Sequence, residues 1–168
     1  MIPERTADVT DTGHSQFVDF YRNNLPTVYG YLLRLCGGDR GLAEDLTQDT
    51  WLALARELAA GRTERADIRW LLTVARSRFL DQLRKSRRET RKLSAVGVAP
   101  DASFEPDRAE VIEFVERLAP PHRAVLMLRY VDDLPVPKIA ALIDRNLAAT
   151  NSLLARARAE LREQVRRS

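Results

Sequence analysis

Helical periodicity on both sides of a proline-containing stretch is the feature that most constrains the fold of this chain of 168 residues. Residues 14–93 and 107–168 place apolar side chains three and four positions apart, which is the spacing of one face of an α-helix. Residues 94–106 contain one glycine and two prolines and show no helical period. No alternation typical of a strand extends beyond a few residues. The sequence therefore predicts an all-α protein of two small helical domains joined by a flexible linker, after a disordered N-terminus of residues 1–13.

Local signals divide the first domain into three helical segments. Pro26 interrupts the first pattern and predicts a kink or a restart of the helix. The glycine pair at residues 37–38 predicts its end, and Asp39 is a suitable N-cap for the next helix. That second helix is expected to end at Gly61, before a short polar loop and a long helix that begins at Ile68.

Basic and acidic residues are unevenly distributed, although the net charge is only +3. Arginine and lysine dominate residues 84–92 and 156–168, whereas carboxylates dominate residues 101–116. Such segregation favours local basic patches that bind a polyanion over a uniformly charged surface.

Disulfides and metal sites are not expected. Cys36 is the only cysteine, so no intrachain disulfide can form. A buried, unreactive side chain is the simplest interpretation of Cys36, and a redox role is the alternative. His14 and His122 lie too far apart in the sequence to indicate a metal site.

Membrane insertion and catalysis are not expected either. No apolar segment approaches the roughly 18 residues of a membrane span, and the N-terminus lacks the apolar core of a signal peptide. No nucleophile, base and orienting group occur together in a recognisable motif. We therefore expect a cytoplasmic protein with no catalytic residues, no cofactor and no small-molecule substrate.

Residues 42–60 carry an acidic face. Four side chains within two turns share one surface of the expected helix: Asp45, Gln48, Asp49 and Leu52. Carboxylates, an amide and an apolar group on one face are suited to a basic protein partner. A solvated surface helix would carry the same pattern, so both interpretations remain open at this point.

Residues 68–88 form a long basic helix. Its core stripe is predicted to contain Ile68, Leu72, Ala75, Phe79 and Leu83. A neighbouring face carries groups that can bind phosphate oxygens or base edges, namely Arg69, Thr73, Arg76, Ser77 and Arg84. Trp70 lies beside this face, where it either stacks on an unpaired base or packs in the core.

The second domain is expected to contain about four short helices, at residues 107–118, 121–131, 137–143 and 147–166. The last two are typical of a helix-turn-helix, with Asn146 as the N-cap of the second helix. Inward-facing residues are predicted to be Ile139, Ala140, Ile143, Leu147, Thr150, Leu154, Ala157 and Leu161. A plain helical hairpin is the alternative.

The face of the last helix opposite this buried stripe is directed toward a DNA major groove in a helix-turn-helix. Ser152 and Arg156 occupy that face at i and i+4. Arg145, Arg158 and Arg162 flank it and are candidates for phosphate contacts.

Taken together, these segments resemble the extracytoplasmic-function sigma factors of bacterial RNA polymerase. The resemblance covers residues 17–162 and rests on AEDLTQDTW, WLLTVARSRFLDQLR, LAPPHRAVLMLRYVDDLPVPKIAALI and LLARARAELR, in this order. It implies two helical domains, called regions 2 and 4, at residues 14–93 and 107–168. It also implies a subunit that binds core polymerase, recognises the −35 and −10 promoter elements, and opens the −10 duplex to initiate transcription.

The resemblance assigns roles to individual positions. The motif that docks on the coiled coil of the β′ clamp corresponds to Asp45, Leu46, Gln48 and Asp49. Residues 60–67 correspond to the loop that captures a flipped base of the −10 element. The helix that contacts and melts this element contains Trp70, Arg76, Ser77, Asp81 and Arg84. The −35 element is read from the positions of Asn151, Ser152 and Arg156. Further partners implied by the family are the β flap of polymerase and an anti-sigma factor.

Several positions depart from the family pattern. Ser77 replaces a frequent asparagine, and an Ala148-Ala149 pair replaces a step that usually contains glycine. The family commonly has basic residues at the positions of Asn151 and Leu153, so two possible phosphate contacts are absent here. Two other functions therefore remain open: a stand-alone helix-turn-helix regulator, and a sigma-like interaction protein without promoter activity.

Overall fold

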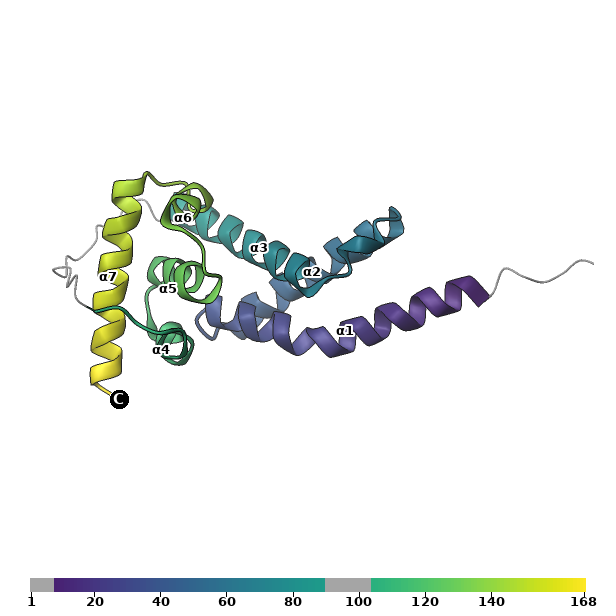
Figure 1. The fold of residues 1–168 in the computed structure, drawn as a ribbon, viewed down its shortest axis with the longest axis horizontal. Helices are drawn as coiled ribbons and strands as arrows, with labels where there is room; N and C mark the ends of the chain where they lie inside the picture. The colour runs from purple at the N-terminus through teal and green to yellow at the C-terminus, as the bar shows by residue number, and fades with distance from the viewer. Residues whose placement is uncertain (1–7, 90–103) are drawn as a thin grey trace, which may run out of the picture.

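The computed structural model describes residues 8–89 and 104–168, and every regular element in these two ranges is helical (Figure 1). The all-α prediction is therefore confirmed. Residues 1–7 and most of the expected linker at 94–106 lie outside the described residues. None of the described helices is both long enough and apolar enough to cross a membrane.

The first domain consists of α1 (Asp8–Leu35), α2 (Arg40–Ala59), the short 3-10 helix η1 (Thr63–Arg65) and α3 (Ile68–Glu89). The end of α1 and the start of α2 form as the sequence predicts. Gly37 and Gly38 adopt positive φ angles, and the Gly38 amide donates to the Leu33 carbonyl, which closes α1. The Asp39 side chain then accepts from the Leu42 amide at 3.1 Å and caps α2.

The first helix differs from the prediction in two ways. It begins at Asp8, inside the segment expected to be disordered. It also continues through Pro26 without a restart. Pro26 is exposed, so water can hydrate the Arg22 carbonyl that loses its usual amide partner.

The second domain contains five short elements and one long helix: α4 (Arg108–Phe114), η2 (Val115–Arg117), α5 (Pro120–Leu126), the π-helical turn η3 (Met127–Val131), α6 (Val136–Leu142) and the long α7 (Leu147–Arg166). A capping box between Asp107 and Glu110 starts α4. Asn146 accepts from the Ala149 amide at 2.7 Å and caps α7, as predicted. The helix-turn-helix prediction therefore corresponds to α6 and α7.

The core stripe of α3 is rotated relative to the prediction. Ala75 and Phe79 are buried as expected, but Leu71 and Leu80 are also buried, whereas Leu72 is partly exposed. The reason is that α3 packs against both α1 and α2, so its buried surface is wider than a single stripe. In α7, Leu147 was expected to be buried but is 49% exposed at the first position of the helix, where fewer residues of its own helix surround it.

Apolar side chains of the two domains join in one buried cluster. Helix α5 lies beside the C-terminal end of α1 and also contacts α3, while α7 packs on the outer side of α5 (Figure 1). The two sequence-distant halves are therefore in direct contact. This contact places part of α3 against the second domain.

Candidate protein-docking and nucleic-acid interfaces

The acidic face of α2 is open to solvent. Asp45, Gln48 and Asp49 are exposed, and Leu52 is 52% exposed beside them. Leu46, which the resemblance places in the docking motif, is only 7% exposed and faces the core. An exposed leucine between carboxylates is an amphipathic surface suited to a basic protein partner.

A cluster of aromatic side chains from α1 and α2 packs next to this face. Trp51 is buried next to Leu52, and its ring meets those of Phe17, Phe20 and Tyr21 at centroid distances of 6.4, 6.0 and 4.7 Å. All three contacts have edge-to-face geometry, which favours a fixed arrangement. The acidic face of α2 is therefore held rigidly on α1.

Residues 60–67 form a loop that is fixed by one carboxylate. Gly61 has a φ of 81°, which turns the chain away from the end of α2. The Arg62 guanidinium donates twice to Glu57, at 2.5 and 2.9 Å, and these hydrogen bonds lower the pKa of Glu57. The Arg65 guanidinium lies 5.9 Å from the centre of the Trp70 ring. The loop and Trp70 therefore form one continuous surface.

The seven residues of α3 assigned to the −10 element fall into two groups. Four are exposed: Arg69, Thr73, Ser77 and Asp81. Three are partly buried: Trp70, Arg76 and Arg84. Trp70 packs partly against the core and keeps one side accessible, so both of its proposed roles are compatible with its position.

Arg76 and Arg84 contact the second domain, which the sequence did not reveal. Arg76 forms an ion pair with Asp132 at 3.4 Å, and each of these side chains is only 14% exposed. Arg84 donates to the Leu142 carbonyl as well as to Asp81 at 2.7 Å. Tyr31 also donates to Asp132, at 2.8 Å, across 101 positions of sequence. No local pattern could have indicated these pairs.

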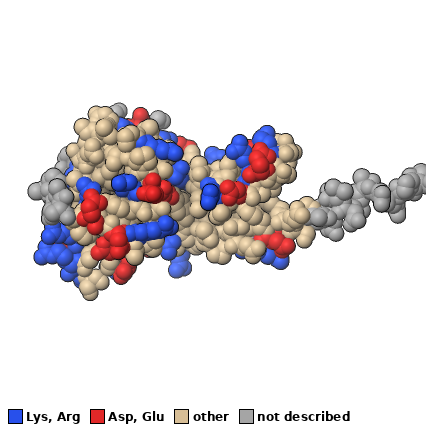
Figure 2. Space-filling view, viewed as in Figure 1, with Lys and Arg blue, Asp and Glu red and all other residues tan. Residues whose placement is uncertain are grey.

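The face of α7 that is expected to read the −35 element is exposed at its first positions and carries little charge there. Asn151 and Ser152 are exposed, and the Arg156 guanidinium donates to the Ser152 carbonyl at 3.3 Å. Leu153 is buried, so of the two positions that lack the family's basic residue only Asn151 could have reached a phosphate. Figure 2 shows few charged side chains at the end of the second domain where α7 begins, and several Lys and Arg near its C-terminal end.

Arg158 occupies a different side of α7 from Arg156. Two positions along a helix correspond to a rotation of about 200°. Arg158 donates to Glu105 at 2.7 Å and to the Tyr130 hydroxyl at 3.3 Å, and only 20% of its side chain is exposed. Arg158 of α7 therefore holds Glu105, in the segment that precedes α4, against α7. Arg145 is half-buried beside the turn between α6 and α7.

Cys36 is 6% exposed at the end of α1, as its interpretation as a buried side chain predicts. Burial, chiefly, raises the pKa of its thiol to about 11. The thiol is therefore protonated near neutral pH and is a poor nucleophile. Among the described residues, no group of three potential metal ligands comes together.

Comparison with known proteins places these features in a family. The model of Sigma-70 region 2 matches residues 20–89, and the model of Sigma-70 region 4 matches residues 108–161. The RNA polymerase sigma factor CarQ of Myxococcus xanthus is 30% identical over 138 residues, which are 79% of this chain and 79% of that protein. The ECF RNA polymerase sigma factor SigK of Mycolicibacterium vanbaalenii is 29% identical over 147 residues, covering 81% of this chain and 74% of that protein.

A solved structure shares the fold. It is the sigma factor RpoE of Bartonella quintana, crystallised with the anti-sigma factor NepR, with a TM-score of 0.51 and 22% identity over 90% of this chain and 97% of that chain. The two matched regions coincide with the two helical halves described above. The chain therefore belongs to the extracytoplasmic-function sigma factors, the subunits of RNA polymerase that direct promoter-dependent transcription initiation.

Proposed function

We propose that this sigma factor docks on the β′ clamp coiled coil of core polymerase through the exposed face of α2. Leu52, together with Asp45, Gln48 and Asp49, is the observation that carries this assignment, because an exposed leucine beside carboxylates and an amide matches the apolar centre and polar rim of a protein interface. Leu46 supports the face from the core side. The carboxylates would steer and orient a basic partner, while Leu52 would be buried on docking.

The −10 element would be opened by α3 and the loop before it. Extruding a base from the duplex costs a few kcal/mol, which contacts to the flipped base must offset. Trp70, partly exposed beside the loop of residues 60–67, offers a stacking surface for such a base. Arg69 and Thr73, on the exposed side of α3, would hold the adjoining backbone.

The −35 element would be read by α7. Asn151 and Ser152 are exposed in the second turn of this helix, and Arg156, which is partly exposed, lies one turn farther along it. An arginine in the major groove pairs well with a guanine edge, whereas Asn151 adds no charge for phosphates. Binding at this element would therefore depend on few phosphate contacts and be weak without polymerase.

The remaining partners follow from the family. Members of this family are transcription regulators rather than enzymes, and this chain would likewise act without catalysis, in the cytoplasm where polymerase works. The second domain would also contact the β flap of polymerase. Because the matched RpoE was crystallised with the anti-sigma factor NepR, an anti-sigma factor is a further proposed partner of this chain.

The test is transcription in vitro with core polymerase on a library of genomic fragments. Discrete start sites are expected with the wild type, and the double variant Asp45→Ala/Gln48→Ala should abolish them together with polymerase binding. Arg156→Ala should weaken or redistribute them. Asp19→Ala, which removes an exposed carboxylate of α1 that is not assigned to polymerase or DNA, is the matched control and should leave transcription unchanged.

Two outcomes would contradict the proposal. Polymerase binding without any start site would favour a sigma-like interaction protein without promoter activity. Tight, specific DNA binding with no polymerase binding would favour a stand-alone helix-turn-helix regulator.

A further inference from the structure

The first residue of α7 is a leucine that the fold leaves exposed. Leu147 is 49% exposed, and only Leu52 is comparable among the large apolar side chains of residues 8–89 and 104–168. Leu52 lies on the face of α2 assigned to polymerase, so these two side chains belong to different surfaces. A single exposed leucine is common on protein surfaces, so the position of Leu147 within the helix-turn-helix decides what it can bind.

Hydrogen bonds of the first turn of α7 fix the direction of Leu147. The Asn146 side chain accepts from the Ala149 amide at 2.7 Å. The hydroxyl of Thr150, which is buried, donates to the Asn146 carbonyl at 2.9 Å. Leu147 therefore projects from a backbone that is already ordered, and its contact with a partner requires little further ordering.

The start of α7 presents an uncharged face to solvent. Four exposed residues lie together in its first two turns: Leu147, Ala148, Asn151 and Ser152. Residues four positions apart are neighbours on a helix surface, so Leu147 adjoins Asn151 and Ala148 adjoins Ser152. Figure 2 shows correspondingly few charged side chains at this end of the second domain.

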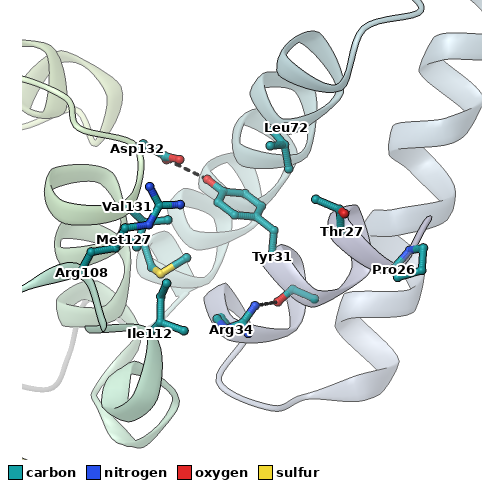
Figure 3. Close-up of a pocket in the computed structure, with 11 residues that line it drawn as sticks. Pro26, Thr27, Tyr31, Arg34, Leu72, Arg108, Ile112, Met127, Val131 and Asp132 are labelled. Atoms are coloured by element: carbon teal, nitrogen blue, oxygen red, sulfur yellow. Dashed lines mark hydrogen bonds between the residues drawn. The ribbon is translucent and has the colours of Figure 1, made fainter. Parts of the chain in front are cut away.

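The exposure of Leu147 is not a gap in the contact between the two domains. Helix α7 packs mainly against α4, α5 and α6 of its own domain. A cavity of about 260 Å³ lies between the domains, and the described residues that line it belong to α1, α3, α4 and η3 or are Asp132 (Figure 3). The exposed start of α7 is therefore a separate surface.

The position of Leu147 corresponds to the part of a helix-turn-helix that meets the bases. The N-terminal residues of the second helix contact base edges in the major groove. In this chain the first two are Leu147 and Ala148. Neither side chain has a donor or an acceptor, so neither can read the hydrogen-bonding pattern of a base pair. The apolar group that base edges present in this groove is the C5-methyl group of thymine.

A leucine at this position favours thymine over cytosine in two ways. Contact with the C5-methyl group removes apolar surface of both partners from water, which is favourable. Cytosine lacks this methyl group and presents an exocyclic amine in the same groove. A leucine packed against that amine removes it from water and supplies no acceptor, which is unfavourable. Ala148 is small and exposed, so the helix can approach the bases closely.

The surroundings of Leu147 favour DNA over a protein as its partner. Leu52, on the face assigned to polymerase, has the carboxylates of Asp45 and Asp49 beside it. Helix α7, by contrast, contains no carboxylate before Glu160. A surface without carboxylates does not repel the phosphates that border a major groove.

We propose that Leu147 is a specificity-determining residue of the −35 interaction, which reads a thymine through its C5-methyl group. Ser152 and Arg156 would read neighbouring bases by hydrogen bonds. The inference rests on the proposed function, because it concerns the same surface of α7 and names the base that this surface recognises.

The test uses holoenzyme assembled from core polymerase and the full chain, on a promoter found by the transcription assay. Each thymine of the −35 element, on either strand, is replaced singly by deoxyuridine, which lacks only the C5-methyl group. We expect at least one replacement to weaken promoter binding by the wild type about three- to fivefold, the effect of losing one buried methyl group. Deoxyuridine between the −35 and −10 elements is the control and should change nothing.

Three variants assign the methyl contact to Leu147. Leu147→Ala should bind the thymine and deoxyuridine promoters equally. Leu147→Met keeps an apolar side chain of similar size and should retain the discrimination. Arg156→Ala should weaken binding to both promoters and still distinguish them, because the two side chains lie nine positions apart and act independently. Circular dichroism of each variant checks that the helices are retained.

Three results would overturn the inference while start sites still support the proposed function. The first is a −35 element in which no deoxyuridine weakens binding. The second is a methyl effect of equal size in the wild type and Leu147→Ala, which would assign the contact to another residue. The third is weaker binding of Leu147→Ala to core polymerase without DNA, which would identify a protein contact. Absence of start sites with the wild type would overturn the proposed function, and this inference with it.

Discussion

The two helices proposed to contact promoter DNA are limited in opposite ways. On α3 the cationic side chains are present, but Arg76 and Arg84 are bonded to the second domain. On α7 the reading positions are accessible, but Asn151 and Ser152 are uncharged. Phosphate binding requires a charge that is also free and exposed, and each of these four positions lacks one of these properties. The number of basic residues in a sequence segment therefore does not show how many of them are available to bind nucleic acid.

The largest expected effect comes from introducing a charge at a buried position of α7. Leu153→Lys puts an ammonium group at a site that is 4% exposed, and burial of an unpaired charge is strongly unfavourable. We expect the free energy of unfolding to fall by about 3 kcal/mol or more, measured by urea denaturation. Asn151→Lys, two positions earlier and exposed, is the control and should change stability by less than about 0.5 kcal/mol. Equal stabilities would show that Leu153 is not a core residue in solution.

The features that the sequence predicts correctly are those that depend on residues close together in the chain. Asp39 and Asn146 were recognised as helix caps because capping involves amides only two or three positions away. The exposed face of α2 was recognised from its helical spacing, and Leu52 is indeed 52% exposed. Helix type, helix ends and the face of an isolated helix are therefore largely predictable from this chain.

The features that escaped prediction depend on tertiary contacts. The phase of the α3 stripe was wrong at Leu72 because α3 packs against two helices and also borders the second domain. The contact between Tyr31 and Asp132 spans 101 positions and has no periodic signal. Arg158 was assigned to phosphates from its charge alone, whereas in the structure it bonds to Glu105 and Tyr130. Its role at DNA stays a prediction.

A smaller effect is expected when charge is restored at an accessible position of α7. Asn151→Lys adds one candidate phosphate contact, which should raise affinity for a −35 duplex about three- to tenfold at low salt. The slope of log affinity against log salt should become steeper by about one unit. Ser15→Lys, an exposed polar residue of α1 far from α7 in sequence, gives the same net charge and should change neither quantity. An equal gain with both variants would show that net charge, not position, limits binding by α7.

The smallest expected effect is a change in stability with pH that arises from the contact between Tyr31 and Asp132 at the interface between the domains. The pKa of Tyr31 is raised in the folded protein by burial and by Asp132, so the folded state holds the phenolic proton more tightly than the unfolded chain does. The stabilisation is complete below the ordinary tyrosine pKa of 10.0 and is lost as pH rises from there toward the folded value. At pH 10 the loss amounts to about 0.4 kcal/mol, since half of the unfolded chains have then ionised at this residue. Urea denaturation between pH 8 and pH 10.5 should therefore show a steeper decline for the wild type than for Tyr31→Phe, which keeps the ring but has no proton to lose. Parallel declines would mean that Tyr31 is solvated in solution, and the restraint on α3 would then depend on Arg76 and Arg84 alone.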